Sequence, residues 1–233
     1  MKTIGLLGGM SWESTVGYYR AINEGVKNSL GGLHSAKIVL YSVDFDSIEK
    51  LQRKGDWAGT AKMLSEAALN IQAAGADFLL ICTNTMHKVA KQIESAIDIP
   101  LLHIADATAE VLIRNGLKKV GLLGTSFTME HEFYKGRLIQ KFGLDVLVPS
   151  EEDRKIVHKI IYQELCLGKI VGESKSEYLR IINNLANEGA EAVILGCTEI
   201  GMLVNQSDTS VRLFDTTVIH AQKAVEQAIL NEP

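Results

Sequence analysis

Apolar positions along the chain follow two alternating patterns. Short apolar runs, typical of buried parallel strands, alternate with longer segments in which apolar residues recur every three or four positions, as in amphipathic helices. The strand-like runs lie at residues 3–7, 37–43, 78–81, 101–103, 119–123, 193–195 and 212–214. The clearest helical segments lie at residues 14–27, 56–73, 152–165 and 176–187. This alternation predicts an α/β fold with helices on both faces of parallel sheets.

The same pattern occurs twice in the chain. The sequence IGLLG at residues 4–8 reappears as VGLLG at 120–124, and GADFLLI at 75–81 reappears as GAEAVIL at 189–195. A third pair, IADAT and LFDTT, follows in the same order, and the spacing between the copies changes only slightly. The duplication predicts two similar Rossmann-like α/β domains related by pseudo-two-fold symmetry.

The repeat also suggests where the domains begin and end. We expect the first domain at residues 1–100 plus a C-terminal helix at about 216–233, and the second at residues 101–215. Ligands of parallel α/β sheets bind beyond the carboxyl ends of the strands. Two such domains facing each other would direct these strand ends at one shared cleft.

Polar clusters stand at equivalent strand ends in the two repeats. ICTNT at residues 81–85 aligns with LGCTE at 195–199, so Thr83 is the counterpart of Cys197. A lone cysteine after a strand is more often a small buried hydrophobe than a catalyst, but packing does not call for polar clusters at both equivalent ends. Cys82 points to the opposite side of its strand and is expected in the core. Each cluster precedes a predicted helix, whose unpaired N–H groups favour a thiolate or a substrate carboxylate.

The turn after the first strand is rich in glycine. GLLGGMS at residues 5–11 matches neither a dinucleotide-binding nor a Walker motif, and its glycines are expected to let the backbone approach a small ligand closely. The matching turn at residues 124–126 offers two hydroxyls to a carboxylate. Ser11, Asp106 and Asp215 are predicted helix caps. The histidines lack metal-ligand spacing, so no metal is assigned, and His87 is a candidate to support the site.

Composition narrows the function classes. The chain has 233 residues, a net charge of -4 and a sequence pI of about 5.9, which gives no electrostatic case for nucleic acid or an anionic membrane. No apolar stretch reaches the ~18 residues of a membrane span, and the first apolar run is too short for a signal peptide. The cysteines are odd in number and far apart, which disfavours a disulfide framework. We expect a cytoplasmic protein.

Three motifs together resemble the aspartate/glutamate racemase family over essentially the whole chain. They are GGMS at residues 8–11, TNTMH at 83–87 and GCTE at 196–199. The resemblance is closest to a bacterial branch with threonine in place of the first catalytic cysteine. It implies an active site between two Rossmann-like domains, usually in a homodimer, with an amino acid as substrate and no pyridoxal phosphate, metal or other cofactor. Two cysteines, one per domain, would exchange the Cα proton from opposite faces.

Carried over by position, the second-domain cysteine is Cys197. The first-domain position falls on Thr83, because this chain has Thr-Asn-Thr where the family has Cys-Asn-Thr. Glu164, near the end of a predicted helix, is a further candidate to face the cleft, where it would alter which substrate side chain is preferred. The residues that fall on substrate contacts of the family are Met10, Gln52, Asn84, Thr85, Thr125 and Thr198.

The resulting hypothesis is racemisation of aspartate, glutamate or both, faster from L to D. Cys197, as thiolate, would remove the α-proton, and Thr83 or a water that it holds would return a proton to the other face. Two alternatives stay open. One is a single-cysteine decarboxylase or isomerase of the same superfamily, and the other is a two-lobed protein that binds a carboxylate without turnover.

Overall fold

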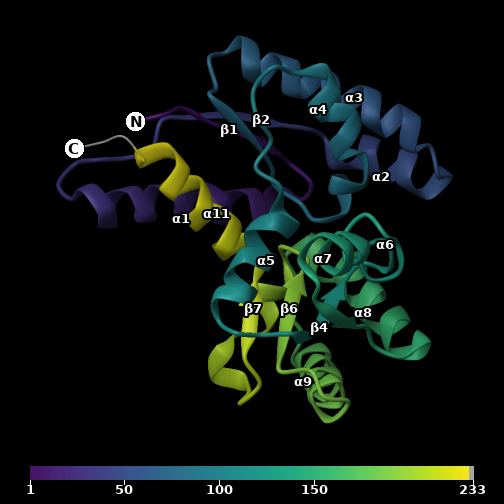
Figure 1. Cartoon of the computed structure of the whole chain (residues 1–233). Helices are drawn as coiled ribbons and strands as arrows, with labels where there is room; N and C mark the ends of the chain where they lie inside the picture. Colours follow the sequence, from purple (N-terminus) through teal and green to yellow (C-terminus); the bar gives the residue numbers. More distant parts are fainter. Residues whose placement is uncertain (231–233) are drawn as a thin grey trace. The chain divides into compact units, whose positions relative to one another are not determined.

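The computed structural model describes residues 1–230 of the chain. It contains two compact units: unit 1 comprises Met1–Ile104 together with the described residues from His220 onward, and unit 2 comprises Ala105–Ile219. Residues 231–233, the end of the predicted C-terminal helix, lie outside the described residues. Each unit contains one parallel sheet with helices packed on it, which confirms the predicted α/β fold (Figure 1).

Unit 1 contains a three-stranded sheet in the order β2-β1-β3. Leu101, in the run predicted as a fourth strand at 101–103, forms a single parallel bridge with Leu79. The last helix, α11 (Thr216–Ile229), begins in unit 2 and continues into unit 1. The other elements are β1 (Ile4–Gly8), α1 (Trp12–Leu30), β2 (Ile38–Ser42), α2 (Phe45–Lys54), α3 (Trp57–Ala73), β3 (Phe78–Ile81), the 3-10 helix η1 (Thr85–Val89) and α4 (Ala90–Ala96).

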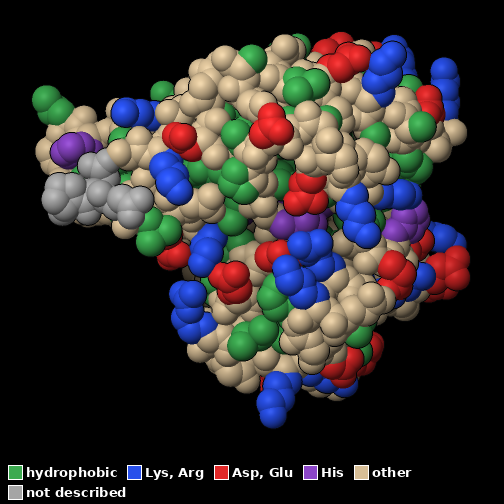
Figure 2. Space-filling model, turned by 45° about the horizontal axis from the view of Figure 1, so that its top comes forward, with side chains coloured by type: hydrophobic (Ala, Val, Ile, Leu, Met, Phe, Trp, Pro, Cys, Tyr) green, Lys and Arg blue, Asp and Glu red, His purple; other side chains and the backbone are tan. Residues whose placement is uncertain are grey.

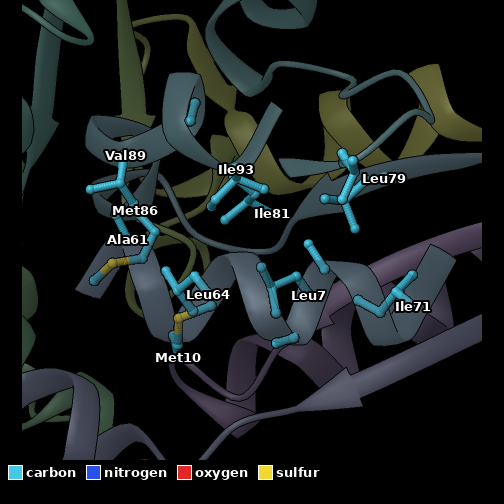
Figure 3. Packing of buried hydrophobic residues seen from close by; sticks show 14 of the residues in the cluster. Leu7, Met10, Ala61, Leu64, Ile71, Leu79, Ile81, Met86, Val89 and Ile93 are labelled. Atoms are coloured by element: carbon cyan, nitrogen blue, oxygen red, sulfur yellow. The ribbon is translucent and has the colours of Figure 1, made fainter. Parts of the chain in front are cut away.

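Helices cover both faces of this sheet because its central strands are apolar on both sides. Leu7 and Ile81 pack with α3 and α4 in one cluster, part of which is seen in Figure 3. Leu6 and Leu80 point to the opposite face and pack against α1 and α11. This arrangement agrees with the near-continuous apolar runs in the sequence, which are typical of strands buried on both faces.

Unit 2 contains a four-stranded sheet in the order β5-β4-β6-β7. Helices α8 and α9 pack against its central strands. The elements are α5 (Ile104–Arg114), β4 (Lys119–Gly124), α6 (Ser126–Glu130), α7 (Lys135–Phe142), β5 (Asp145–Leu147), α8 (Glu151–Gln163), the 3-10 helix η2 (Leu165–Leu167), α9 (Gly172–Asn187), β6 (Ala192–Gly196), α10 (Ile200–Leu203), the 3-10 helix η3 (Gln206–Asp208) and β7 (Leu213–Asp215).

The two sheets repeat the same pairing register. Strand β1 pairs with β3 in parallel from Ile4 opposite Phe78, and β4 pairs with β6 from Val120 opposite Ala192. These are the positions that the sequence repeat aligns. The repeat therefore describes two copies of one supersecondary unit, and it places Thr83 and Cys197 at equivalent points after equivalent strands.

One strand was not predicted, and one helix ends earlier than predicted. Strand β5 has only three residues, partly exposed at the sheet edge, so its short run gave no clear strand pattern. Helix α8 ends at Gln163 rather than at residue 165, because Glu164 leaves the helical conformation with φ −127° and ψ −67°. Cys166 lies after this helix, in the separate turn η2.

The surface carries charges of both signs. Acidic and basic side chains are interspersed over the face seen in Figure 2. Within residues 1–230, every helix is too short or too polar to cross a bilayer.

Candidate active site

The loop after β1 is fixed by a small network around Thr15. The Gly9 N–H donates to Thr15 Oγ1 at 2.8 Å, and the Thr15 hydroxyl donates to the Ser11 carbonyl at 2.8 Å. Gly9 has φ +93°, and a Cβ there would collide with the backbone of Val43, so only glycine fits. Ser11 accepts from the Ser14 N–H and caps α1, as predicted. The backbone at this strand end therefore has one defined conformation.

The strand end after β3 carries Thr83, Asn84 and Thr85, all of them buried. His87 Nδ1 lies 2.8 Å from the Thr83 carbonyl oxygen, and its Nε2 accepts from the Ile104 N–H at 3.2 Å. These partners require a neutral imidazole with the proton on Nδ1. His87 thus holds the backbone of Thr83, in agreement with its predicted supporting role.

A second histidine lies behind His87. The ring centroids of His87 and His220 are 6.1 Å apart. His220 Nε2 donates to the Leu102 carbonyl at 2.8 Å, and its Nδ1 accepts from the Tyr18 hydroxyl at 2.9 Å. Complete burial lowers the pKa of His220 to about 4. His220 is therefore neutral near pH 7 and acts as a structural support, which its sequence context did not indicate.

Cys82 lies in the hydrophobic cluster between the sheet, α1 and α11. It is fully buried, and burial raises the pKa of its thiol. The structure therefore places Cys82 in the core, as expected.

Gln52 has an unusual environment on α2. Its side chain is only 5% exposed, and neither Oε1 nor Nε2 has a hydrogen-bond partner. Burying an amide without partners is costly, which makes Gln52 a strong candidate for a ligand contact. Met10, by contrast, packs in the same core cluster as Leu7 and Leu64, so its side chain has a structural role in unit 1 (Figure 3).

In unit 2, the strand end after β6 forms a compact polar group. The Cys197 thiol donates to Glu199 Oε2 at 2.9 Å, and the Thr198 hydroxyl donates to the same oxygen at 2.8 Å. All three side chains are buried. The Thr216 hydroxyl donates to the Leu195 carbonyl and ties the start of α11 to this strand. One buried carboxylate oxygen of Glu199 therefore accepts hydrogen bonds from both the Thr198 hydroxyl and the Cys197 thiol.

The electrostatics of Cys197 differ from the sequence-based expectation. Burial, the charge of Glu199 and the nearby thiol of Cys166 raise its pKa well above the ordinary value. The backbone N–H of Glu199, the residue before the short helix α10, lowers the pKa of Cys197 as expected, but burial and the neighbouring charges outweigh it. The resting group is a thiol beside a proton acceptor.

The remaining predicted residues of unit 2 have local partners. Glu164 Oε2 accepts from the Ser174 hydroxyl at 2.6 Å. Thr125 follows β4 and caps α6 by accepting from the Thr128 N–H. Burial, followed by the charges of Cys197 and Glu199, raises the pKa of Tyr178. Cys166 and Glu164 also influence Tyr178, so these side chains share one electrostatic environment with Cys197.

Two of the other predicted caps had different outcomes. Asp215 accepts from the Thr217 N–H at 2.8 Å and caps α11, as expected. Asp106 instead lies inside the first turn of α5 and forms ion pairs with Arg137 and Lys141, so its predicted capping role was wrong. Within the described part of the chain, no group of three or more His, Cys, Asp or Glu side chains is arranged to hold a metal ion.

Comparison with known proteins shows to which family the chain belongs. The sequence profile of Asp/Glu/Hydantoin racemases matches residues 7–224. The chain belongs to the Asp/Glu/Hydantoin racemase family. A Yersinia pestis crystal structure, described as that of a candidate Asp/Glu racemase, is similar to it at 57% identity and a TM-score of 0.91, covering 98% of this chain and 100% of that one.

Two further proteins named as racemases or racemase homologues are also similar to this chain. An aspartate racemase homologue from Pyrococcus horikoshii shares 36% identity with a TM-score of 0.84, covering 98% of this chain and 99% of that one. The broad specificity amino-acid racemase RacX of Bacillus subtilis is 21% identical over 171 residues, 70% of each chain. The family and these relatives support an amino-acid racemase, an isomerase, as the enzyme class.

Sequence reasoning did not include Glu199 among the candidate site residues of this racemase-family chain. Its signal was present, because Glu199 ends the same Cys-Thr-Glu motif that singled out Cys197. The motif alone did not show that the carboxylate turns back toward the thiol. That contact assigns Glu199 to the same polar group as Cys197 and Thr198.

Proposed function

We propose that this chain racemises an acidic amino acid, aspartate or glutamate, by proton transfer at Cα without pyridoxal phosphate or metal. The observation that carries the proposal is the buried Cys197 thiol donating to Glu199, at the strand end equivalent to Thr83. It supplies a nucleophilic sulfur with a built-in proton acceptor, as proton abstraction from carbon requires.

The reaction begins with a proton transfer inside unit 2. Glu199 takes the thiol proton of Cys197 and leaves a thiolate. Because burial and neighbouring charges raise the pKa of Cys197, this thiolate is a stronger base than an exposed one. It removes the α-proton of the L-isomer, and the C–H electron pair passes to Cα and the carboxylate as an enolate-like carbanion.

The second transfer uses Thr83. Its hydroxyl, or a water hydrogen-bonded to it, gives a proton to the opposite face of Cα and completes the D-isomer. The alkoxide or hydroxide left behind takes up a proton from solvent, and Glu199 releases the thiol proton to solvent, which restores the starting state. A threonine hydroxyl is a far weaker acid than a thiol, so it can protonate a very basic carbanion but serves poorly as a base. The two directions therefore run at different rates, with L to D faster.

We assign substrate binding to the remaining predicted residues. The α-carboxylate accepts from backbone N–H groups near Asn84 and from the Thr85 hydroxyl. Thr198, whose hydroxyl proton goes to Glu199, keeps lone pairs for the substrate ammonium group. The unpartnered amide of Gln52 binds a substrate carboxylate.

Met10 shapes the apolar wall next to the Gly9 loop, and Thr125 and Glu164 complete the contacts from unit 2. The proposal also includes a homodimer. It places the protein in the reducing cytoplasm, because catalysis by Cys197 needs a free thiol.

The test is an amino-acid panel incubated without added cofactor and followed by chiral separation. We expect interconversion of aspartate or glutamate enantiomers, abolished in Cys197→Ser and retained in the matched core variant Cys82→Ser. Decarboxylation of malonates without racemisation would instead identify the decarboxylase alternative. Tight binding of an acidic amino acid with no turnover would identify a binding protein.

A further inference from the structure

An apolar groove lies on unit 1 between α1 and the edge strand β2, which are labelled in Figure 1. Trp12, Val16 and Tyr19 follow one another at helical spacing along α1 and are 64%, 48% and 52% exposed. Leu40 of β2 is 43% exposed beside them. The groove has a volume of about 410 Å³ and is lined by Trp12, Thr15, Val16, Tyr19, Leu40 and Ser42.

This exposure is unusual for these elements. Strands of parallel sheets are normally buried on both faces, yet the apolar strand β2 is half-buried at its start and exposed from Leu40 onward. Helix α1 already packs a first apolar stripe, with Tyr18 and Ile22, against the sheet. Trp12, Val16 and Tyr19 form a second stripe on its outer side. Contiguous exposed apolar surface of this kind marks an interaction site.

We propose that this groove is the surface on which a second copy of the chain docks. The inference rests on the homodimer of the proposed function and assigns its interface. None of the six residues that line the groove is charged, although the chain as a whole has a net charge of -4. Two acidic copies can therefore meet here without burying like charges against each other.

The composition also fits a self-complementary contact. In a two-fold dimer the same patch of both copies meets, so a groove and projecting aromatic side chains must lie on one surface. Trp12 and Tyr19 provide the side chains, and the gap between α1 and Leu40 provides the groove. Tryptophan and tyrosine are enriched at the centres of protein interfaces, where charged residues are depleted.

Docking at this groove would act on the candidate active site. Thr15 lines the groove and also accepts the hydrogen bond from the Gly9 N–H. Trp12 follows Ser11, the capping residue of α1, directly. A second copy on this surface holds the first turn of α1, and through Thr15 and Ser11 it holds the glycine loop.

The test compares molar mass by light scattering for the full-length wild type, Val16→Arg and the control Leu69→Arg. Leu69 is an equally apolar, exposed position on α3 of the same unit. We expect a dimeric wild type and control, and a Val16→Arg variant that is monomeric at the same concentration. Circular dichroism should give the same spectrum for all three, because both substituted positions are exposed.

The possible results of this experiment distinguish the groove assignment from the homodimer itself. A dimer that persists in Val16→Arg would overturn the groove as the interface and leave the homodimer intact. A monomeric wild type would overturn both the homodimer and this inference. Racemase assays on the same samples judge the proposed function independently, and Val16→Arg is expected to lose activity in step with dimer dissociation.

Discussion

The replacement Glu199→Gln tests the role of the carboxylate beside Cys197. Glutamine keeps the shape of the side chain but carries no charge and is a poor proton acceptor. The Cys197–Glu199 hydrogen bond is 2.9 Å long and buried, so the loss falls on a contact shielded from water. We expect slower racemisation together with a more acidic thiol.

The size of the effect follows from the contact. A hydrogen bond to a charged group contributes about 1.5–3 kcal/mol, and about 1.4 kcal/mol corresponds to a tenfold change in rate. Losing the charged hydrogen-bond acceptor should therefore lower kcat by about tenfold to a hundredfold, and the loss of proton transfer to Glu199 adds to this decrease. The pKa of Cys197 should fall, because a neighbouring negative charge that raises it is removed.

The assay combines initial rates with the pH dependence of thiolate absorbance in a Cys166→Ser background. The matched control is Glu188→Gln, an exposed carboxylate at the end of α9. Rates within twofold of wild type would refute the proton-acceptor role. An unchanged Cys197 pKa would refute the electrostatic coupling between the thiol and the Glu199 carboxylate.

Three further predictions address other features. Gly9→Ala should lower the free energy of unfolding by about 2 kcal/mol or more in urea titrations, because of its positive φ and the Val43 backbone, whereas Gly17→Ala, in an open helical position, should not. The pKa of His220 lies at about 4, below the unfolded value near 6.5, so roughly 3 kcal/mol of stability is present above pH 6.5 and lost as the pH falls toward 4. His220→Gln, which does not titrate, should flatten this part of the curve of unfolding free energy against pH. An unchanged slope in this variant would mean that another group causes the pH dependence. Thr83→Cys should bring the L-to-D and D-to-L initial rates closer together, and an unaltered ratio would argue against Thr83 as the second proton-transfer position.

The two similar units were predictable because buried parallel strands leave an apolar pattern that is hard to lose. The registers of β1 with β3 and of β4 with β6 coincide with the sequence repeat, so the equivalence of Thr83 and Cys197 followed from the sequence. Strand β5 was missed because a short edge strand needs few apolar residues.

The electrostatic state of Cys197 was not predictable in the same way. The motif suggested a thiolate at a helix N-terminus, but side-chain direction and burial decide the pKa, and neither can be read from a tripeptide. The carboxylate of Glu199 turns toward the sulfur, and burial acts in the same direction. The partners of Asp106 on α7 likewise depend on tertiary packing.

The central claim is that proton exchange at Cα is asymmetric, with Cys197 removing the α-proton and Thr83 returning a proton to the other face. Its most direct test is deuterium incorporation at Cα, measured by mass spectrometry on separated enantiomers of aspartate and glutamate in D₂O at low conversion. We predict that deuterium enters the product enantiomer while the remaining substrate keeps its proton, with a faster rate from the L-isomer. Equal rates from both enantiomers, or deuterium appearing in unreacted substrate, would contradict the account.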